Sequence, residues 1–407
     1  MKRVNNIWII ILFMLAGCGG GGKSGNIGIN ANEIMSESAI NFEETPITVD
    51  VIANYPKKEL KLQDFMDVEY IPLETSREFV CQGRVRAIGE KFIVVMNEIV
   101  DGDIFIFDRN GKGLRKINRR GNGPEEYLDA LPSNVLLDED NDELIIYDHY
   151  TRKIIVYDLY GKFKRSFRHK EGFFYGSLYN FNTDYLICNQ AFYDDGDRNG
   201  IVIISKHNGN VIKDIEIPYE QLKTTSMRIP MGQRFGIASI DGPTARTIIP
   251  HHGNWILVEI SSDTIFRYLP DHNMTPFIVR TPSVQSMNPE VFLYPALLTD
   301  RYYFMKAVKK EFDIKTRQGF PSKDLMYDRQ EKKLFEYTVY NDDFSYKGPV
   351  NFGRSASTDE IAFCQKIEAD DLFDAYKEGQ LKGKLKEIAA GLKEEDNPVL
   401  MLVKHKK

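Results

Sequence analysis

The chain has 407 residues, of which 42% are hydrophobic and 12% aromatic. This hydrophobic content is enough for a sizeable core, and the excess of Phe and Tyr over Trp favours strands. Basic side chains number 53 and acidic ones 59, which gives a formal charge of −6 with both signs interspersed along the chain. Because no basic stretch is long enough to neutralise a phosphate backbone, nucleic-acid binding is disfavoured.

The N-terminus has the features of an export signal. Lys2 and Arg3 precede an apolar run, residues 7–14, which is too short to cross a bilayer as a helix. Small residues then lead to Cys18, and the whole pattern resembles a bacterial lipoprotein signal with its lipobox. The resemblance implies a signal peptide over residues 1–17 and diacylation of the Cys18 thiol, whose acyl chains would hold the protein on a membrane. The alternative is a short uncleaved anchor with a chance cysteine.

Residues 18–44 are predicted to be a flexible tether. Their first half is mostly Gly, Asn and Ser, a composition that buries too little surface to offset the entropy lost on ordering. The stretch after Cys18 lacks the acidic cluster that resembles a surface-export signal in such bacteria. We therefore expect the protein on the periplasmic face of the outer membrane rather than on the cell surface.

From residue 45 onward, short apolar or alternating runs are broken by Gly, Asp and Asn, which is an all-β pattern. Residues 104–112 (IFIFDRNGK) recur as residues 155–162 (IVYDLYGK), and weaker copies occupy residues 203–210 and 325–330. Each copy indicates a strand, a tight turn with Gly at positive φ, and a returning strand. The spacing of about 50 residues is typical of propeller blades.

Three stretches carry a family resemblance. Residues 61–75 and residues 396–403 match a first and a last strand, and residues 119–127 (RRGNGPEEY) match a GxGPxEY-like segment that follows an FDxxGK hairpin. Together they resemble the six-bladed β-propeller lipoproteins of Bacteroides-type bacteria, which are related in shape to NHL-type propellers. The resemblance implies a six-bladed β-propeller over residues 45–407 and leaves the function open.

The ends of the ring are expected to meet. An open propeller would expose two sheet edges, so we expect residues 68–73 and the strand 399–403 to share a closing blade. Before that last strand, Asp371 is expected to cap one short amphipathic helix. Its apolar side chains recur four, three and four residues apart, at Leu381, Leu385, Ile388 and Leu392. The mixed Lys and Glu on its other face favours packing against the rim over binding to a membrane or a partner.

Candidate ligand-binding residues fall in two groups. Residues 119–127 are predicted to be a folded connection between blades, in which Arg120 pairs with Glu125 or Glu126. As a binding element at the central channel, this segment would use Arg119, Arg120, Asn122, Glu125 and Tyr127. The other candidates are histidines at the propeller mouth: His149, His251 and His252. His251 and His252 would share a metal only in a turn, since neighbouring side chains on a strand point to opposite faces; surface loops are the alternative.

One segment matches the first half of a calcium loop. Asp195, Asp197 and Asn199 supply oxygen atoms at alternate positions. The position that requires a bidentate Glu is Lys206, which excludes an EF-hand and leaves a looser calcium site or an acidic turn. Residues 138–143, which lack the glycine, are interpreted as a solvated hairpin turn.

The remaining cysteines are Cys81, Cys188 and Cys364, which allow at most one disulfide and have no zinc-site spacing. Each has apolar neighbours, so buried thiols are favoured.

Two functions from different classes remain open. The first is a monomeric, lipid-anchored and non-catalytic binding or scaffold module for an envelope protein, peptide or glycan. The second is an NHL-like propeller enzyme, a metal-assisted lyase or hydrolase that acts on a small envelope or glycan-derived substrate. No GxSxG elbow, P-loop or dinucleotide fingerprint occurs, and no cysteine has a nearby histidine with a supporting carboxylate, which favours the binding module.

Overall fold

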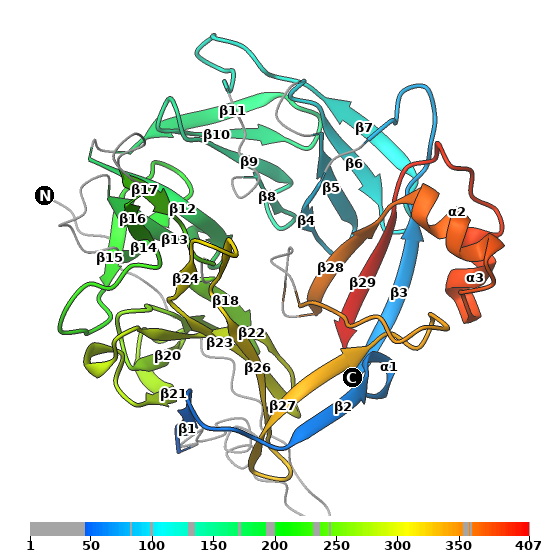
Figure 1. Cartoon of the computed structure of the whole chain (residues 1–407). Helices are drawn as coiled ribbons and strands as arrows, with labels where there is room; N and C mark the ends of the chain where they lie inside the picture. Colours follow the sequence, from blue (N-terminus) through cyan, green and yellow to red (C-terminus); the bar gives the residue numbers. More distant parts are fainter. Residues whose placement is uncertain are drawn as a thin grey trace, which may run out of the picture. The chain divides into compact units, whose positions relative to one another are not determined.

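The computed structural model describes residues 45–406 except for 82–83, 98–100, 129–134, 170–171, 193–199, 231–236, 244–245, 353–357 and 359. The chain divides after Glu44, so the predicted signal peptide and tether lie outside these residues. In the described part, strands dominate and are arranged as six blades around a common axis (Figure 1). The predicted all-β, six-bladed propeller is therefore confirmed.

Blades 1 to 3 are four-stranded antiparallel sheets whose strands follow in chain order. Blade 1 contains β4 (Arg84–Ile88), β5 (Phe92–Met96), β6 (Ile104–Asp108) and β7 (Gly113–Ile117). Blade 2 contains β8 (Val135–Asp138), β9 (Glu143–Asp148), β10 (Lys153–Asp158) and β11 (Phe163–Arg168). Blade 3 contains β12 (Phe173–Asn180), β13 (Tyr185–Phe192), β14 (Gly200–Ser205) and β15 (Val211–Ile215).

Blades 4 and 5 each gain a fifth, parallel strand from the N-terminal segment. Blade 4 contains β18 (Ile248–His251), β19 (Asn254–Leu257), β20 (Thr264–Tyr268) and β21 (Met274–Thr281), with β1 (Ile47–Asp50) beside β21. Blade 5 contains β22 (Val291–Leu298), β23 (Tyr302–Lys309), β26 (Ser322–Asp328) and β27 (Lys333–Tyr340), with β2 (Lys57–Lys61) beside β27. Small additions to the blades are β16 (Met227–Pro230), β17 (Ile237–Ile240), β24 (Phe312–Asp313), β25 (Gln318–Gly319) and the 3-10 helix η1 (Val284–Ser286).

Blade 6 joins the two ends of the propeller. Its described strands are β28 (Ile361–Ile367), β29 (Val399–His405) and β3 (Met66–Pro72), with β29 in the middle. The C-terminal strand β29 pairs with β3 in seven antiparallel positions, from Val399 opposite Pro72 to His405 opposite Met66. Figure 1 shows the red β29 between the orange β28 and the blue β3. The expected closing blade is confirmed.

The hydrophobic core lies between the blades. Six clusters of buried side chains each join two neighbouring blades, and together they fill all six gaps around the ring. Strands in the middle of a blade are therefore apolar on both faces, as in Val94 and Val95 of β5, which are both fully buried. This is why the apolar runs read as continuous rather than alternating.

The two ends of the ring carry different loops. In blade 2 the turns 139–142 and 159–162 lie at one end of the strands, and the turn 149–152 lies at the other. We call the first end the hairpin face and the second the connection face. On the hairpin face, the turn between the first two strands of one blade contacts the corresponding turn of the neighbouring blade. The Glu139 carboxylate accepts hydrogen bonds from three backbone N–H groups of residues 90–92, and the Asn141 amide donates to the Thr183 carbonyl at 2.8 Å.

The sequence repeat corresponds to the third and fourth strands of a blade. Asp108 accepts hydrogen bonds from the N–H groups of Asn110 and Lys112, which closes a turn in which Gly111 has a φ of 83°. A Cβ atom at Gly111 would lie 2.1 Å from the carbonyl oxygen of Pro72, in the last strand of the preceding blade. The glycine is required because the turn adopts positive φ and also packs against the neighbouring blade.

The expected C-terminal helix is two shorter helices, α2 (Ala369–Lys377) and α3 (Gly383–Ala389), on the rim of blade 6. Gly379, between the two helices, and Gly383, the first residue of α3, both have positive φ. Asp371 was wrongly predicted as the cap, since it lies inside the first turn of α2 and Glu368 occupies the capping position. Leu381 and Leu385 are buried against the blade, as expected for rim packing. Within the described ranges no helix has the length and apolar character needed to cross a bilayer.

The N-terminal segment is also held by an ion pair. Lys58 of β2 donates to the Asp328 carboxylate of blade 5 at 2.9 Å, and Arg301 donates to the same group at 3.2 Å. Asp328 is fully buried. Burial alone would raise the pKa of Asp328, but the hydrogen bonds from Lys58 and Arg301 outweigh it and lower this pKa to about 2.

Replacing Lys58 by Met should reduce the free energy of unfolding at pH 7 by about 1–3 kcal/mol, because Asp328 loses a charged partner. In the parent, the depressed pKa of Asp328 stabilises the fold above its unfolded pKa of about 3.9, and this contribution is lost as the pH falls towards about 2. The difference between parent and Lys58→Met should therefore shrink over that range. Urea denaturation at a series of pH values measures it.

Lys61→Met is the matched control. Lys61 lies on the same strand, and its Nζ lies 3.0 Å from the carboxylate of the half-exposed Asp342. Because water screens this pair, Lys61→Met should destabilise the fold clearly less than Lys58→Met. Equal effects of the two substitutions, or a Lys58→Met effect that does not change between pH 7 and pH 2, would contradict this account of how β2 is held.

Candidate functional site

Residues 119–127 lie in the connection between β7 of blade 1 and β8 of blade 2, as predicted. The Tyr127 side chain is fully buried, and its hydroxyl donates to the Gly102 carbonyl at 2.7 Å. The Tyr127 N–H donates to the Arg119 carbonyl, while the Gly121 N–H donates back to the Tyr127 carbonyl. Arg119 in turn donates from Nε to the Gly161 carbonyl of blade 2 at 2.8 Å. Tyr127 and Arg119 therefore hold the connection in place.

The other predicted residues of this segment are exposed. Arg120 donates from Nε to the Leu128 carbonyl at 3.3 Å, and the side chains of Asn122 and Glu125 face solvent. The Glu126 carboxylate accepts from the Gly123 N–H at 2.7 Å. The pairing of Arg120 with Glu125 or Glu126 stays a prediction. These exposed polar groups belong to a backbone that Tyr127 and Arg119 hold in place.

Asp148 is the residue that organises the connection face at this point. Its side chain is fully buried at the end of β9. One carboxylate oxygen accepts from the Leu128 N–H at 2.8 Å, and the other accepts from the N–H groups of Tyr150 and Thr151 at 3.0 and 3.1 Å. The predicted segment 119–127 and the predicted His149 are thus brought together. The sequence analysis missed Asp148, although an Asp between a buried strand and a turn is the signal that Asp108 and Asp158 also give.

Apolar and aromatic side chains are exposed at the same place. Leu128 is 36% exposed and Tyr150 is 67% exposed. The His149 ring lies 5.7 Å from the Tyr150 ring and 5.1 Å from the Phe174 ring, both in edge-to-face geometry. We call these four residues (Leu128, His149, Tyr150 and Phe174) the aromatic patch. It lies on the connection face where blades 2 and 3 meet.

His251 and His252 lie on the opposite, hairpin face. They occupy the tight turn between β18 and β19, where His252 has a φ of 52° and Gly253 a φ of 67°. Because of this turn their rings come within 4.3 Å of each other, as the sequence analysis required for a shared site. His405 of β29 joins them, with its ring 6.4 Å from that of His252. The sequence analysis missed His405, which follows an apolar strand but stands in a polar tail.

The two paired histidines have different surroundings. His251 is buried, and His252 is half exposed with its Nε2 at 2.9 Å from an Asp300 carboxylate oxygen. Burial and then the positive fields of His252, Arg267, His405 and Arg329 lower the pKa of His251 to about 2, so this ring is neutral. In the part of the chain that the structure describes, no group of three or more His, Cys, Asp or Glu side chains is arranged to hold a metal.

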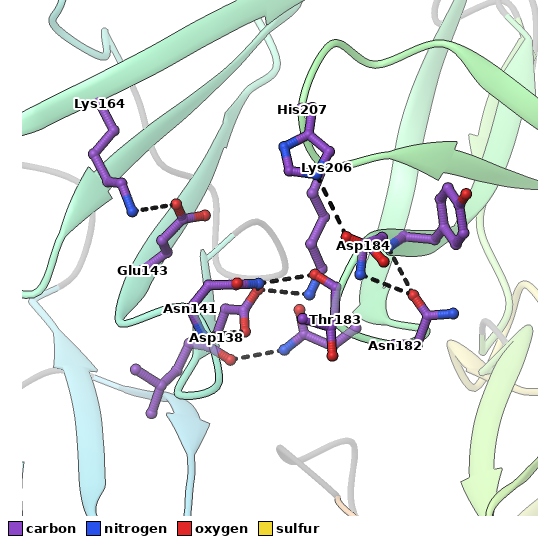
Figure 2. Close-up of polar contacts among 12 residues, drawn as sticks. Asp138, Asn141, Glu143, Lys164, Asn182, Thr183, Asp184, Lys206 and His207 are labelled. Carbon is purple, nitrogen blue, oxygen red and sulfur yellow. Dashed lines mark hydrogen bonds and ion pairs between the residues drawn. The ribbon is translucent and has the colours of Figure 1, made fainter. Parts of the chain in front are cut away.

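The hairpin face also contains a buried ion pair, which Figure 2 shows. Lys206 and Asp138 are both almost fully buried, and Nζ of Lys206 lies 2.5 Å from the Asp138 carboxylate. The amide of Asn141 donates to the same carboxylate at 2.9 Å, and Glu143 pairs with Lys164 at 2.5 Å. The interpretation of residues 138–143 as a solvated turn is therefore wrong at its ends. Asp138 and Glu143 can be buried because they have charged partners, namely Lys206 in the turn after β14 for Asp138, and Lys164 and Arg165 of β11 for Glu143.

Two predicted sites lie outside the described residues. These are the calcium loop with Asp195, Asp197 and Asn199, and the acylated Cys18. Lys206, the residue that excluded an EF-hand, is the partner of Asp138.

The expectation of buried thiols is confirmed. Cys81, Cys188 and Cys364 are free and buried. Burial raises the pKa of Cys81 and of Cys364 to about 12 and that of Cys188 well above its usual range, so all three thiols are protonated at neutral pH.

Three solved structures show what the fold is similar to. A putative exported protein from Bacteroides fragilis aligns with a TM-score of 0.60 at 17% identity, covering 89% of this chain and all of that one. A DUF4221 family member from Bacteroides vulgatus aligns with a TM-score of 0.46 at 10% identity, covering 84% and 98%. Virginiamycin B lyase from Staphylococcus aureus aligns with a TM-score of 0.35 at 10% identity, covering 84% and 100%.

No curated protein matches the chain. The profile of the family described as "Domain of unknown function (DUF4934)" matches residues 46–404, from just before β1 into β29. The chain belongs to the DUF4934 family.

Proposed function

We propose that this protein is a lipid-anchored binding module of the cell envelope, which engages a protein, peptide or glycan partner through its connection face. The observation that carries the proposal is the aromatic patch, where Tyr150 is 67% exposed beside Leu128, His149 and Phe174. Exposed Tyr side chains with apolar neighbours mark binding surfaces, because they supply large contact areas at low entropic cost.

The backbone under the aromatic patch is fixed before any partner arrives. Asp148 holds both Leu128 and Tyr150 through their N–H groups, and Lys153 donates to the Pro124 carbonyl behind them. A surface that is already ordered loses little entropy on association, so more of the contact energy contributes to affinity. The exposed Arg120, which donates to the Leu128 carbonyl, provides a polar group at the rim of this surface.

The anchor is the second part of the proposal. Cys18 follows a short apolar run and small residues, and acylation there would tie the propeller to a membrane through the tether 18–44. The outer membrane, on its periplasmic side, is the proposed location. The similarity in fold to a protein described as putatively exported supports this placement outside the cytoplasm.

Replacing Tyr150 by Ala should remove a central contact of the partner. We expect crosslinked pull-downs from the native envelope to retain a stoichiometric partner with the parent, and at least about tenfold less of it with Tyr150→Ala. Quantitative mass spectrometry of the retained material measures the ratio. The matched control is Tyr160→Ala, since Tyr160 is 74% exposed on the hairpin face of the same blade. Tyr160→Ala should retain the partner like the parent.

Retention of the same partner at equal levels by the parent, Tyr150→Ala and Tyr160→Ala would show that the connection face of blade 2 is not the binding surface. Absence of any reproducible partner in the parent pull-down, combined with no glycan binding on an envelope glycan array, would contradict the binding-module proposal itself.

Replacing Cys18 by Ser should abolish acylation, because the hydroxyl does not replace the thiol in lipid transfer. The variant should lose incorporation of a palmitate analogue and leave the membrane fraction. Metabolic labelling followed by fractionation checks both, and Cys188→Ser is the control because Cys188 is buried within the propeller. Equal labelling of the Cys18→Ser variant and the parent would refute the anchor.

A further inference from the structure

Basic side chains from blades 4, 5 and 6 converge on the hairpin face, away from the aromatic patch. Arg267 lies on β20, Arg329 in the turn after β26, and His405 on β29. They surround the turn that carries His251 and His252. The members of this basic cluster are His251, His252, Arg267, Arg329 and His405. Strands far apart in the sequence therefore bring five cationic or proton-binding groups to one place.

Aromatic rings set the spacing within the basic cluster. The Arg267 guanidinium lies 4.7 Å from the centre of the Phe277 ring, and the Arg329 guanidinium lies 5.4 Å from the centre of the Tyr303 ring. These two rings are 5.1 Å apart, and His251 lies about equally far from both, at 6.0 and 5.9 Å. Each guanidinium group therefore lies over an aromatic ring that neighbours the His251 imidazole.

The buried Nε2 atom of His251 is the observation that points to a ligand. The residue is only 6% exposed, and this atom has no hydrogen-bond partner among the residues that the structure describes. Buried polar atoms are nearly always paired, since an unpaired one costs about 1–3 kcal/mol. A ligand that accepts a hydrogen bond here would satisfy this nitrogen and would also sit in the field of the two arginines.

One carboxylate belongs to the same place. Asp300 accepts from His252 Nε2 at 2.9 Å, and its backbone carbonyl accepts from Arg329 at 2.6 Å. The Asp300 side chain is 70% exposed, so water screens its charge. The Asp300 carboxylate shows that an oxyanion fits against this cluster. This carboxylate pairs with His252, on the solvent side of the cluster.

We propose that the basic cluster binds a small oxyanion, a carboxylate or a phosphate group, between blades 4 and 5. Arg267 and Arg329 provide positive charge, and the buried His251 donates a hydrogen bond. His252, which is half exposed, lies at the opening. Arginine matches the planar and tetrahedral geometry of these groups, and hydrogen bonds to them are about twice as strong as neutral ones. This site is separate from the proposed partner surface, so it stands or fails independently.

Titration with inorganic phosphate and with acetate tests the proposal. ³¹P line broadening, and chemical-shift changes for acetate, should give saturable binding of at least one probe to the parent protein at constant ionic strength. Arg329→Gln should weaken it about tenfold, which corresponds to one charged hydrogen bond, and His252→Gln, at the opening, should also weaken it. Both residues are partly exposed, so these variants keep the fold testable where a change at the buried Arg267 or His251 could disrupt it. Circular dichroism checks folding.

Two further variants fix the specificity of the result. His207→Gln is the matched control, since His207 is a 68% exposed histidine on the hairpin face that pairs with Asp184, and it should bind like the parent. Asp300→Asn removes the competing carboxylate and should tighten binding. Binding of neither probe, equal binding by parent and Arg329→Gln, or weaker binding by Asp300→Asn would each overturn the proposal.

Discussion

Pairing of β3 with β29 is the constraint on which the rest of the molecule depends. In a propeller each blade buries its faces only against its neighbours, so a ring that stays open leaves two blades half solvated. Here the N-terminal segment supplies β1 to blade 4, β2 to blade 5 and then β3 to blade 6. The segment crosses three successive blades before the chain enters the ring at β4. Closure therefore depends on contacts between residues more than 300 positions apart, such as Tyr70 opposite Met401.

Closure also decides what the two faces of the ring can do. Each inter-blade gap is filled by its own hydrophobic cluster, so the blades serve as a rigid frame and the loops carry the chemistry. On the connection face, buried Asp148 fixes a surface with exposed aromatic rings. On the hairpin face, His405 is brought to His252 only because β29 is locked into blade 6. The proposed partner surface and the proposed oxyanion site thus depend on one closing strand.

Much of the fold could be predicted because its signals are local. The Asp and Gly of the turn at Asp108 and Gly111 recur as Asp158 and Gly161 in blade 2, where the Asp closes the turn by hydrogen bonding and the Gly packs against the preceding blade. The strands β1 and β2 could not be predicted, since β2 reads Lys-Lys-Glu-Leu-Lys and its pairing with β27 leaves no apolar pattern. The prediction of some site residues failed for the same reason. Asp138 looked solvated because its partner Lys206 lies 68 positions away, and His405 stood in a polar tail.

Amide hydrogen exchange along β3 and β29 tests the closure most directly. If the N-terminal strand seals the ring, residues 66–72 should exchange as slowly as residues 399–405 and with the same opening free energy, because neither strand opens without the other. Both should be among the slowest segments of the propeller, in spite of their place near the chain ends. Exchange in β3 that is more than about tenfold faster than in β29 would mean that the N-terminal strand frays while the ring persists, which would contradict this account.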